Sequence, residues 1–177
     1  FSMKVIIPGL HNSDEGHWQS ILERENPQEY FRVIQEDWDK PNCEDWIQTI
    51  EDSLKAYYHS ELILIGHSIG CMAIVHWYHR FKRKIKGALL VAPSDAESLA
   101  YPEYIEGFAP IPLEELPFKS IVVGSTNDHV SSLERIEHFA IAWNSKLVVL
   151  ENAGHIETKS GFGSWPLAEQ LISELEA

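Results

Sequence analysis

The chain has 177 residues, 44% of them hydrophobic, and its 27 acidic against 14 basic side chains give a formal net charge of −13. This length suits one domain with a full hydrophobic core, and the acidic balance argues against binding to nucleic acids or to anionic membranes. No apolar run is long enough to span a membrane, and two separated cysteines, Cys43 and Cys71, make neither a disulfide framework nor a zinc site.

The spacing of apolar residues predicts strands that alternate with helices along the whole chain. Strands are predicted at residues 5–7, 31–35, 62–65, 88–92, 121–123 and 147–150, and helical patterns at 18–22, 46–57, 71–80, 133–143 and 167–175. This alternation is typical of an α/β domain with a parallel sheet, and we assign residues 3–177 to one such domain. The start of the chain reads as a first strand rather than a signal peptide, with Phe1 and Ser2 expected to be an expression scar.

A loop containing glycine follows the first predicted strand, which Pro8-Gly9 ends. Loops at the carboxyl ends of parallel strands meet at one edge of the sheet, so the backbone N–H of Leu10 is a candidate donor to an oxyanion. A plain turn is the alternative interpretation. His11, His17 and Trp38 are candidates for the wall of a substrate pocket. Packing and helix capping are the alternative roles for His17.

Residues 62–71 read Leu-Ile-Leu-Ile-Gly-His-Ser-Ile-Gly-Cys, which is a buried strand, then Gly-x-Ser-x-Gly, then the start of a helix. This context makes the motif a nucleophile elbow, with Ser68 in a strained conformation at its tip. Gly66 and Gly70 are expected because a Cβ at either position would collide across the turn. The N–H of Ile69 is the second candidate oxyanion donor. The alternative is a serine that caps an ordinary β–α turn.

Three polar side chains follow three predicted strands in the order Ser68, Asp128, His155, which is the order used by α/β-hydrolases. A serine hydroxyl is a weak nucleophile, so His155 would take its proton, while Asp128 would orient the imidazole and stabilise its charged form. Asp95 also follows a strand and is the rival acid, with Asp14 a weaker rival. Taken singly, Asp128 is consistent with an Asx turn and His155 with an ordinary loop histidine.

Other polar residues suggest weaker alternatives. The carboxylates Glu36, Asp37 and Asp39 resemble part of a metal site, but no histidine or cysteine cluster with ligand spacing accompanies them, which favours a solvated loop. His67 is expected to pack or to make a local hydrogen bond. Four prolines in residues 101–117 predict a loop, in which a small cap over the site is expected from Tyr101, Tyr104, Ile105 and Phe108.

Several stretches together resemble the small serine hydrolases related to retinoblastoma-binding protein nine and to the bacterial YdeN proteins. They are Pro8 to Gln19, Asp37-Trp38-Asp39-Lys40-Pro41, Gly66 to Cys71, Ala88 to Pro93, Gly124 to Asp128 and Ala153-Gly154-His155. The likeness runs from about residue 3 to residue 175 and fits the bacterial branch best. The Asp-Trp-Asp-x-Pro and Gly-His-Trp-Gln elements are more specific than the elbow alone.

The resemblance implies a three-layer α/β-hydrolase fold in a minimal version. It has a mainly parallel six-stranded sheet in the order 2-1-3-4-5-6, flanked by helices, without the first two strands of the larger fold and with no separate lid domain. It also implies the triad Ser68, Asp128 and His155. His129 departs from the bacterial pattern, which often has Pro there. The departure leaves the triad intact, but the resemblance then does not define the conformation of the loop that carries Asp128. The pocket-protein ligand motif Leu-x-Cys-x-Glu is not matched by Cys43-Glu44, so that partner is not expected.

We therefore expect a cytoplasmic serine hydrolase that cleaves small esters, or else amides or short peptides, through an acyl-enzyme and without a metal or cofactor. Its partner would be a small-molecule substrate, with no nucleic acid and no membrane. One alternative is a non-catalytic interaction module on a hydrolase scaffold, because fold does not fix function. Another is acyl transfer or carbon–carbon cleavage at the same triad.

Overall fold

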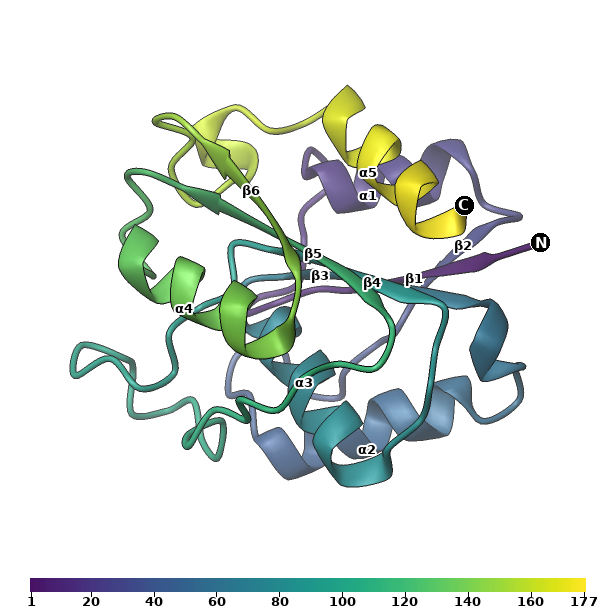
Figure 1. The fold of residues 1–177 in the computed structure, drawn as a ribbon, viewed down its shortest axis with the longest axis horizontal. Helices are drawn as coiled ribbons and strands as arrows, with labels where there is room; N and C mark the ends of the chain where they lie inside the picture. The colour runs from purple at the N-terminus through teal and green to yellow at the C-terminus, as the bar shows by residue number, and fades with distance from the viewer.

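The computed structural model describes all residues from 1 to 177 and consists of a six-stranded parallel sheet between two layers of helices (Figure 1). The sheet order is β2-β1-β3-β4-β5-β6, as predicted. The strands are β1 (Met3–Ile7), β2 (Tyr30–Arg32), β3 (Leu62–His67), β4 (Gly87–Val91), β5 (Lys119–Ser125) and β6 (Lys146–Leu150).

Five α-helices connect and cover the strands. On one face lie α1 (Trp18–Glu25) and α5 (Pro166–Glu176), and on the other α2 (Cys43–Leu54), α3 (Ile69–Phe81) and α4 (Leu133–Trp143) (Figure 1). Short 3₁₀ helices occur at His59–Glu61 and Thr158–Ser160. None of the helices combines the length and the apolar composition that crossing a bilayer would require.

The two central strands, β3 and β4, are buried at every position. Alternate side chains point to opposite faces of a strand, so Leu64 packs with α2 and α3 while Ile63 and Ile65 pack with α1 and α5. A parallel sheet covered on both faces needs this continuous apolar run, and the run is what made these strands visible in the sequence.

The observed bounds depart most from the predicted ranges in two strands, the second and the fifth. The second was expected over residues 31–35 but β2 ends at Arg32, because only Val33 N–H still bonds to the neighbouring strand and Ile34 is 62% exposed. The fifth was expected over 121–123 but extends from Lys119 to Ser125, since it pairs with strands on both sides. Residues 101–117 form no helix and no named strand, as predicted.

Candidate active site

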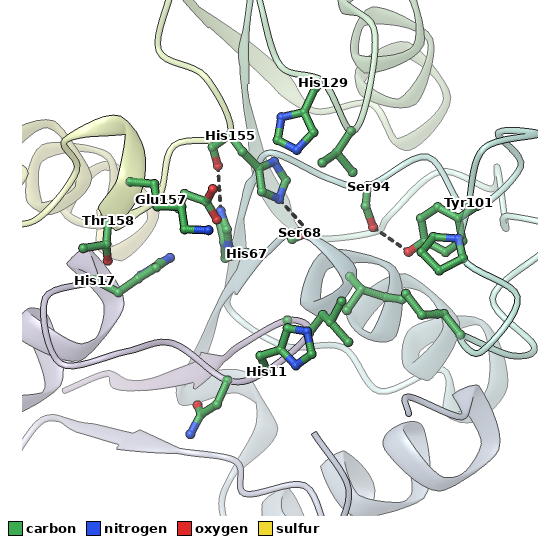
Figure 2. A pocket seen from close by; sticks show the side chains of 18 of the residues that line it. His11, His17, His67, Ser68, Ser94, Tyr101, His129, His155, Glu157 and Thr158 are labelled. Carbon is green, nitrogen blue, oxygen red and sulfur yellow. Dashed lines mark hydrogen bonds between the residues drawn. The ribbon is translucent and has the colours of Figure 1, made fainter. Parts of the chain in front are cut away.

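Three loops at the carboxyl edge of the sheet bring Ser68, Asp128 and His155 together. Figure 2 shows the contact between Ser68 and His155. His155 Nε2 lies 2.9 Å from Ser68 Oγ, and His155 Nδ1 lies 2.9 Å from one carboxylate oxygen of Asp128 and 3.1 Å from the other. The Asp128 side chain is fully buried and that of His155 is 8% exposed. A carboxylate only accepts hydrogen bonds, so Nδ1–H donates to Asp128, which leaves Nε2 of the neutral ring as the acceptor for the Ser68 hydroxyl.

Ser68 has the strained backbone expected at the tip of the turn, with φ 57° and ψ −122°. A Cβ on Gly66 would lie 2.8 Å from Ile74 Cδ1 and 3.2 Å from the backbone nitrogen of Cys71, so it would crowd the start of α3 across the turn. A Cβ on Gly70 would instead lie 2.2 Å from the carbonyl oxygen of Ile7. The reason expected for Gly70 was therefore wrong. A Cβ there would collide with the end of β1 and not across the turn, so this glycine is needed for α3 to start close to β1.

The candidate oxyanion donors are free. The backbone N–H of Leu10 makes no hydrogen bond within the protein, and that of Ile69, the first residue of α3, has no acceptor inside its helix. Gly9 presses against the elbow, because a Cβ there would lie 3.2 Å from Ser68 Cβ and 3.3 Å from the Ile69 nitrogen. The loop after β1 is therefore held close to the serine.

The two rival acids have other partners. Asp95 binds the Arg135 guanidinium through both carboxylate oxygens, at 3.0 and 3.2 Å. Asp14 accepts a hydrogen bond from the hydroxyl of Thr158 at 2.6 Å. Neither makes a hydrogen bond to His155, whose Nδ1 meets only Asp128.

His67 supports the general-base loop. Its Nε2–H donates to the carbonyl oxygen of His155 at 2.8 Å, and its ring lies 4.8 Å from that of His155, measured between centroids. Burial, together with the neighbouring His155 and His17, lowers the pKa of His67 well below its ordinary value, so the ring is neutral. Packing or a local hydrogen bond was expected: the ring is buried and packs as expected, but its hydrogen-bond partner is 88 residues away in the chain.

A cavity of about 620 Å³ opens over Ser68. His11 and His17 line it as expected, but Trp38 does not. Trp38 packs edge-on against Trp46, with ring centroids 5.7 Å apart, and its carbonyl oxygen accepts the N–H of His11. The expectation for Trp38 was therefore wrong, because its side chain does not reach the cavity and only its carbonyl oxygen contacts a residue of the wall, His11.

His17 occupies an unusual position in this wall. It is 4% exposed and caps α1, with Nδ1 accepting the backbone N–H of Gln19 at 3.1 Å. Burial lowers the pKa of His17 to about 4, so the ring is neutral near pH 7. With Nδ1 acting as acceptor, the proton is on Nε2, which is buried and has no hydrogen-bond partner.

The expected cap is formed only in part. Tyr101 and Ile105 line the cavity, and the Tyr101 hydroxyl lies 2.9 Å from Ser94 Oγ (Figure 2). Phe108 instead belongs to the core at 2% exposure, and Tyr104 is 47% exposed. Sequence reasoning did not place Ser94, because a serine after a strand carries no directional signal.

The acidic loop that follows β2 has a structural role in the protein. Asp37 accepts the backbone N–H groups of Asp39 and Lys40, and Asp39 Oδ1 lies 2.8 Å from His11 Nδ1. No group of three or more histidine, cysteine, aspartate or glutamate side chains is arranged to hold a metal ion.

This fold and this edge of the sheet define a hydrolase of the α/β-hydrolase type. The chain belongs to the serine hydrolase family, whose model matches residues 4–174. YdeN of Bacillus subtilis, described as a hydrolase, is 23% identical over 191 residues, which cover 95% of this chain and 93% of YdeN.

Solved structures agree with this assignment. A YdeN-like hydrolase from Pectobacterium atrosepticum is 32% identical with a TM-score of 0.85, over 98% of this chain and 89% of that one. The structure of YdeN itself is 20% identical with a TM-score of 0.86, over 99% and 98%. Carboxylesterase CesB of Bacillus subtilis shares the fold at 11% identity and a TM-score of 0.72, over 99% and 84%. The expected YdeN-type family is confirmed.

Proposed function

We propose that this protein cleaves small carboxylic esters through an acyl-enzyme on Ser68. The observation that carries the proposal is the unbroken chain of hydrogen bonds from the Ser68 hydroxyl through His155 to Asp128. In this proposal Ser68 is the nucleophile, His155 the general base and Asp128 the residue that orients it. Esters are the first choice because an alkoxide leaving group departs more easily than an amide nitrogen.

The first half of the reaction forms the acyl-enzyme. Ser68 Oγ attacks the ester carbonyl carbon while His155 Nε2 takes the hydroxyl proton, and the buried Asp128 stabilises the imidazolium. The backbone N–H groups of Leu10 and Ile69 receive the negative oxygen of the tetrahedral intermediate. The imidazolium then gives its proton to the leaving alcohol as the carbon–oxygen bond breaks.

The second half repeats these steps with water. His155 takes a proton from a water molecule, the resulting hydroxide attacks the acyl carbon, and a second tetrahedral intermediate forms at the same donors. Its collapse releases the carboxylic acid and returns the proton to Ser68 Oγ. No step requires a metal or an organic cofactor.

The cavity walls suggest how a substrate is oriented. Tyr101 lies on one side of Ser68, and the polar residues His17 and Thr158 lie on the other (Figure 2). Ile69 and Ile105 add apolar surface to the same cavity. His11, which belongs to the oxyanion loop, also lines the cavity.

We also propose a reducing cytoplasm as the compartment. The support is that Cys43 and Cys71 are both free and buried thiols.

The test is a Ser68→Ala variant assayed with short p-nitrophenyl esters and with a fluorophosphonate probe. We expect ester turnover and covalent labelling to disappear, because both need the Ser68 oxygen. Ser53→Ala, on the half-buried face of α2, is the matched control and should behave as wild type. Undiminished labelling of the Ser68→Ala protein would refute the assignment.

A wild-type protein inert to the probe and to a broad ester panel would favour a non-catalytic role, and product analysis with added alcohols would detect acyl transfer.

A further inference from the structure

The Gly-His-Trp-Gln stretch at the start of α1 is not required by the chemistry of the triad. Trp18 and Gln19 are its first two helical residues, and they are 1% and 0% exposed. Successive side chains on a helix point about 100° apart, so these two residues reach different neighbours. One reaches the loop that carries His155, and the other reaches the loop that carries Leu10.

Trp18 holds the general-base loop. Its indole Nε1–H donates to the carbonyl oxygen of Ile156 at 3.0 Å, and His67 donates to the preceding carbonyl, that of His155. Ile156 has φ 51°, a left-handed conformation that a β-branched residue rarely adopts. Gly154, on the other side of His155, also has a positive φ. Such backbone persists only where surrounding contacts impose it.

Gln19 holds the oxyanion loop. Its Nε2 donates to the carbonyl oxygens of Ile7 at 3.3 Å and Ile65 at 2.9 Å, and its Oε1 accepts the hydroxyl of Ser13 at 2.6 Å. Ile7 is the last residue of β1, and Ile65 lies in β3, the strand that leads to Ser68. The amide therefore ties the far end of the oxyanion loop to both strands that position the serine.

The same loop needs this support because its backbone is strained. His11 and Asn12 both have φ 65°, directly after Leu10. Arg32 adds a second tie, with its guanidinium donating to Asn12 Oδ1 at 2.7 Å and to the Ser13 carbonyl at 3.1 Å. Residues of α1 and β2 thus stabilise the loop conformation in addition to the hydrogen bonds within the loop.

We propose that Trp18 and Gln19 are positioning residues, through which one turn of α1 sets both the general base and the oxyanion donors relative to Ser68. The proposal rests on the proposed function, since it presumes that His155 and Leu10 act in catalysis. Misplacing a reacting group by about 1 Å can lower the rate about 100-fold. Loss of either tie should therefore reduce kcat while leaving KM nearly unchanged, because neither side chain lines the cavity.

The first test is Trp18→Phe, which keeps a buried aromatic ring and removes the donor to Ile156. We expect kcat for a p-nitrophenyl ester, counted per fluorophosphonate-reactive site, to fall about 10- to 100-fold with KM within about twofold. The matched control is Trp165→Phe. Trp165 packs edge-on against Trp18, with ring centroids 5.2 Å apart, and its indole makes no hydrogen bond. This control should keep the wild-type kcat.

The second test is Gln19→Met, with Ser13→Ala as a milder variant that removes only the loop end of the same tie. Affinity for phenylboronic acid, which forms a tetrahedral adduct on the serine, should weaken by the same factor as kcat/KM. Gln35→Met removes another buried amide, which bonds to the carbonyl of Trp46, and should leave kcat unchanged.

Wild-type kcat in folded Trp18→Phe and Ser13→Ala proteins, even with a lowered melting temperature, would overturn the proposal and leave the motif a purely structural role. Equal losses of kcat in the control variants would also overturn it. A wild-type protein without fluorophosphonate labelling would instead overturn the proposed function, so the two failures are distinguishable.

Discussion

Replacing Gly9 with alanine tests whether the loop after β1 supplies an oxyanion donor. Gly9 does not have a positive φ, so alanine is compatible with its backbone and the only penalty is steric. The new Cβ would lie 2.9 Å from the His67 carbonyl oxygen, 3.2 Å from Ser68 Cβ and 3.3 Å from the Ile69 nitrogen. These atoms belong to the elbow, and no side-chain rotation can move them away from the new Cβ.

The size of the effect follows from these contacts. Ordinary Cβ contacts begin at 3.4 Å, so the loop must retreat by about half an ångström from the 2.9 Å contact. Oxyanion donors act at about 2.7–3.1 Å, and losing one lowers kcat by about 100- to 1,000-fold. We expect a partial loss at Leu10, with kcat reduced by about 30- to 100-fold and KM changed little. Overpacking should also cost about 2 kcal/mol of unfolding free energy.

The assay measures p-nitrophenyl ester turnover per site labelled by a fluorophosphonate, with thermal melting recorded in parallel. Gly163→Ala is the control, because its Cβ would crowd a backbone oxygen at a similar distance, 3.2 Å, but that oxygen belongs to Gly16 and not to the elbow. A Gly9→Ala protein that melts at a lower temperature but keeps its kcat per labelled site within twofold would show that Leu10 is not an oxyanion donor.

Two further predictions concern the acid and a buried histidine. Asp128→Asn should lower kcat by up to about 10⁴-fold, while Asp95→Asn should mainly reduce stability by freeing Arg135; the reverse pattern in ester assays would show the acid to be misassigned. The pKa of His17 is about 4 in the folded protein and near its ordinary 6.5 when unfolded, so the unfolded chain binds more protons between these values and stability falls as pH drops through that window. We expect this residue to remove about 2 kcal/mol of unfolding free energy between pH 7 and pH 5. His17→Asn keeps a capping acceptor and should flatten the pH dependence of urea unfolding; an unchanged slope would contradict the neutral ring.

Residues that follow a regular period were predictable from the sequence. The apolar run of β3 identified a buried strand, and the helical stripe from Leu133 to Trp143 coincides with α4. The strand order also agreed with the resemblance to YdeN-type hydrolases. The prediction for the edge strand β2 was too long. This strand pairs with β1 alone, and its last hydrogen bond to β1 is that of the Val33 N–H, so nothing keeps the chain extended beyond that residue.

The wall of the cavity was much less predictable. Tyr101 and Phe108 lie in the same loop, yet the first lines the cavity and the second is buried in the core. An irregular segment has no period from which the direction of a side chain could be inferred. Trp38 also lies in an irregular segment, and the prediction that its side chain lines the pocket was wrong. Only its carbonyl oxygen contributes to the wall, by accepting the N–H of His11.

Backbone strain explains why the chemistry was visible in the sequence while its geometry was not. Eight residues other than glycine have a positive φ, and six of them lie in loops at the carboxyl edge of the sheet: His11, Asn12, Ser68, Ala92, Asn152 and Ile156. Asparagine tolerates this conformation through its own side chain, but isoleucine and alanine do not favour it. At Ile156 the conformation must come from partners far away in the chain, such as the indole of Trp18. The nucleophile, base and acid can thus be recognised from single residues in the sequence. Their alignment depends on tertiary contacts that hold the strained loops at the edge of the sheet.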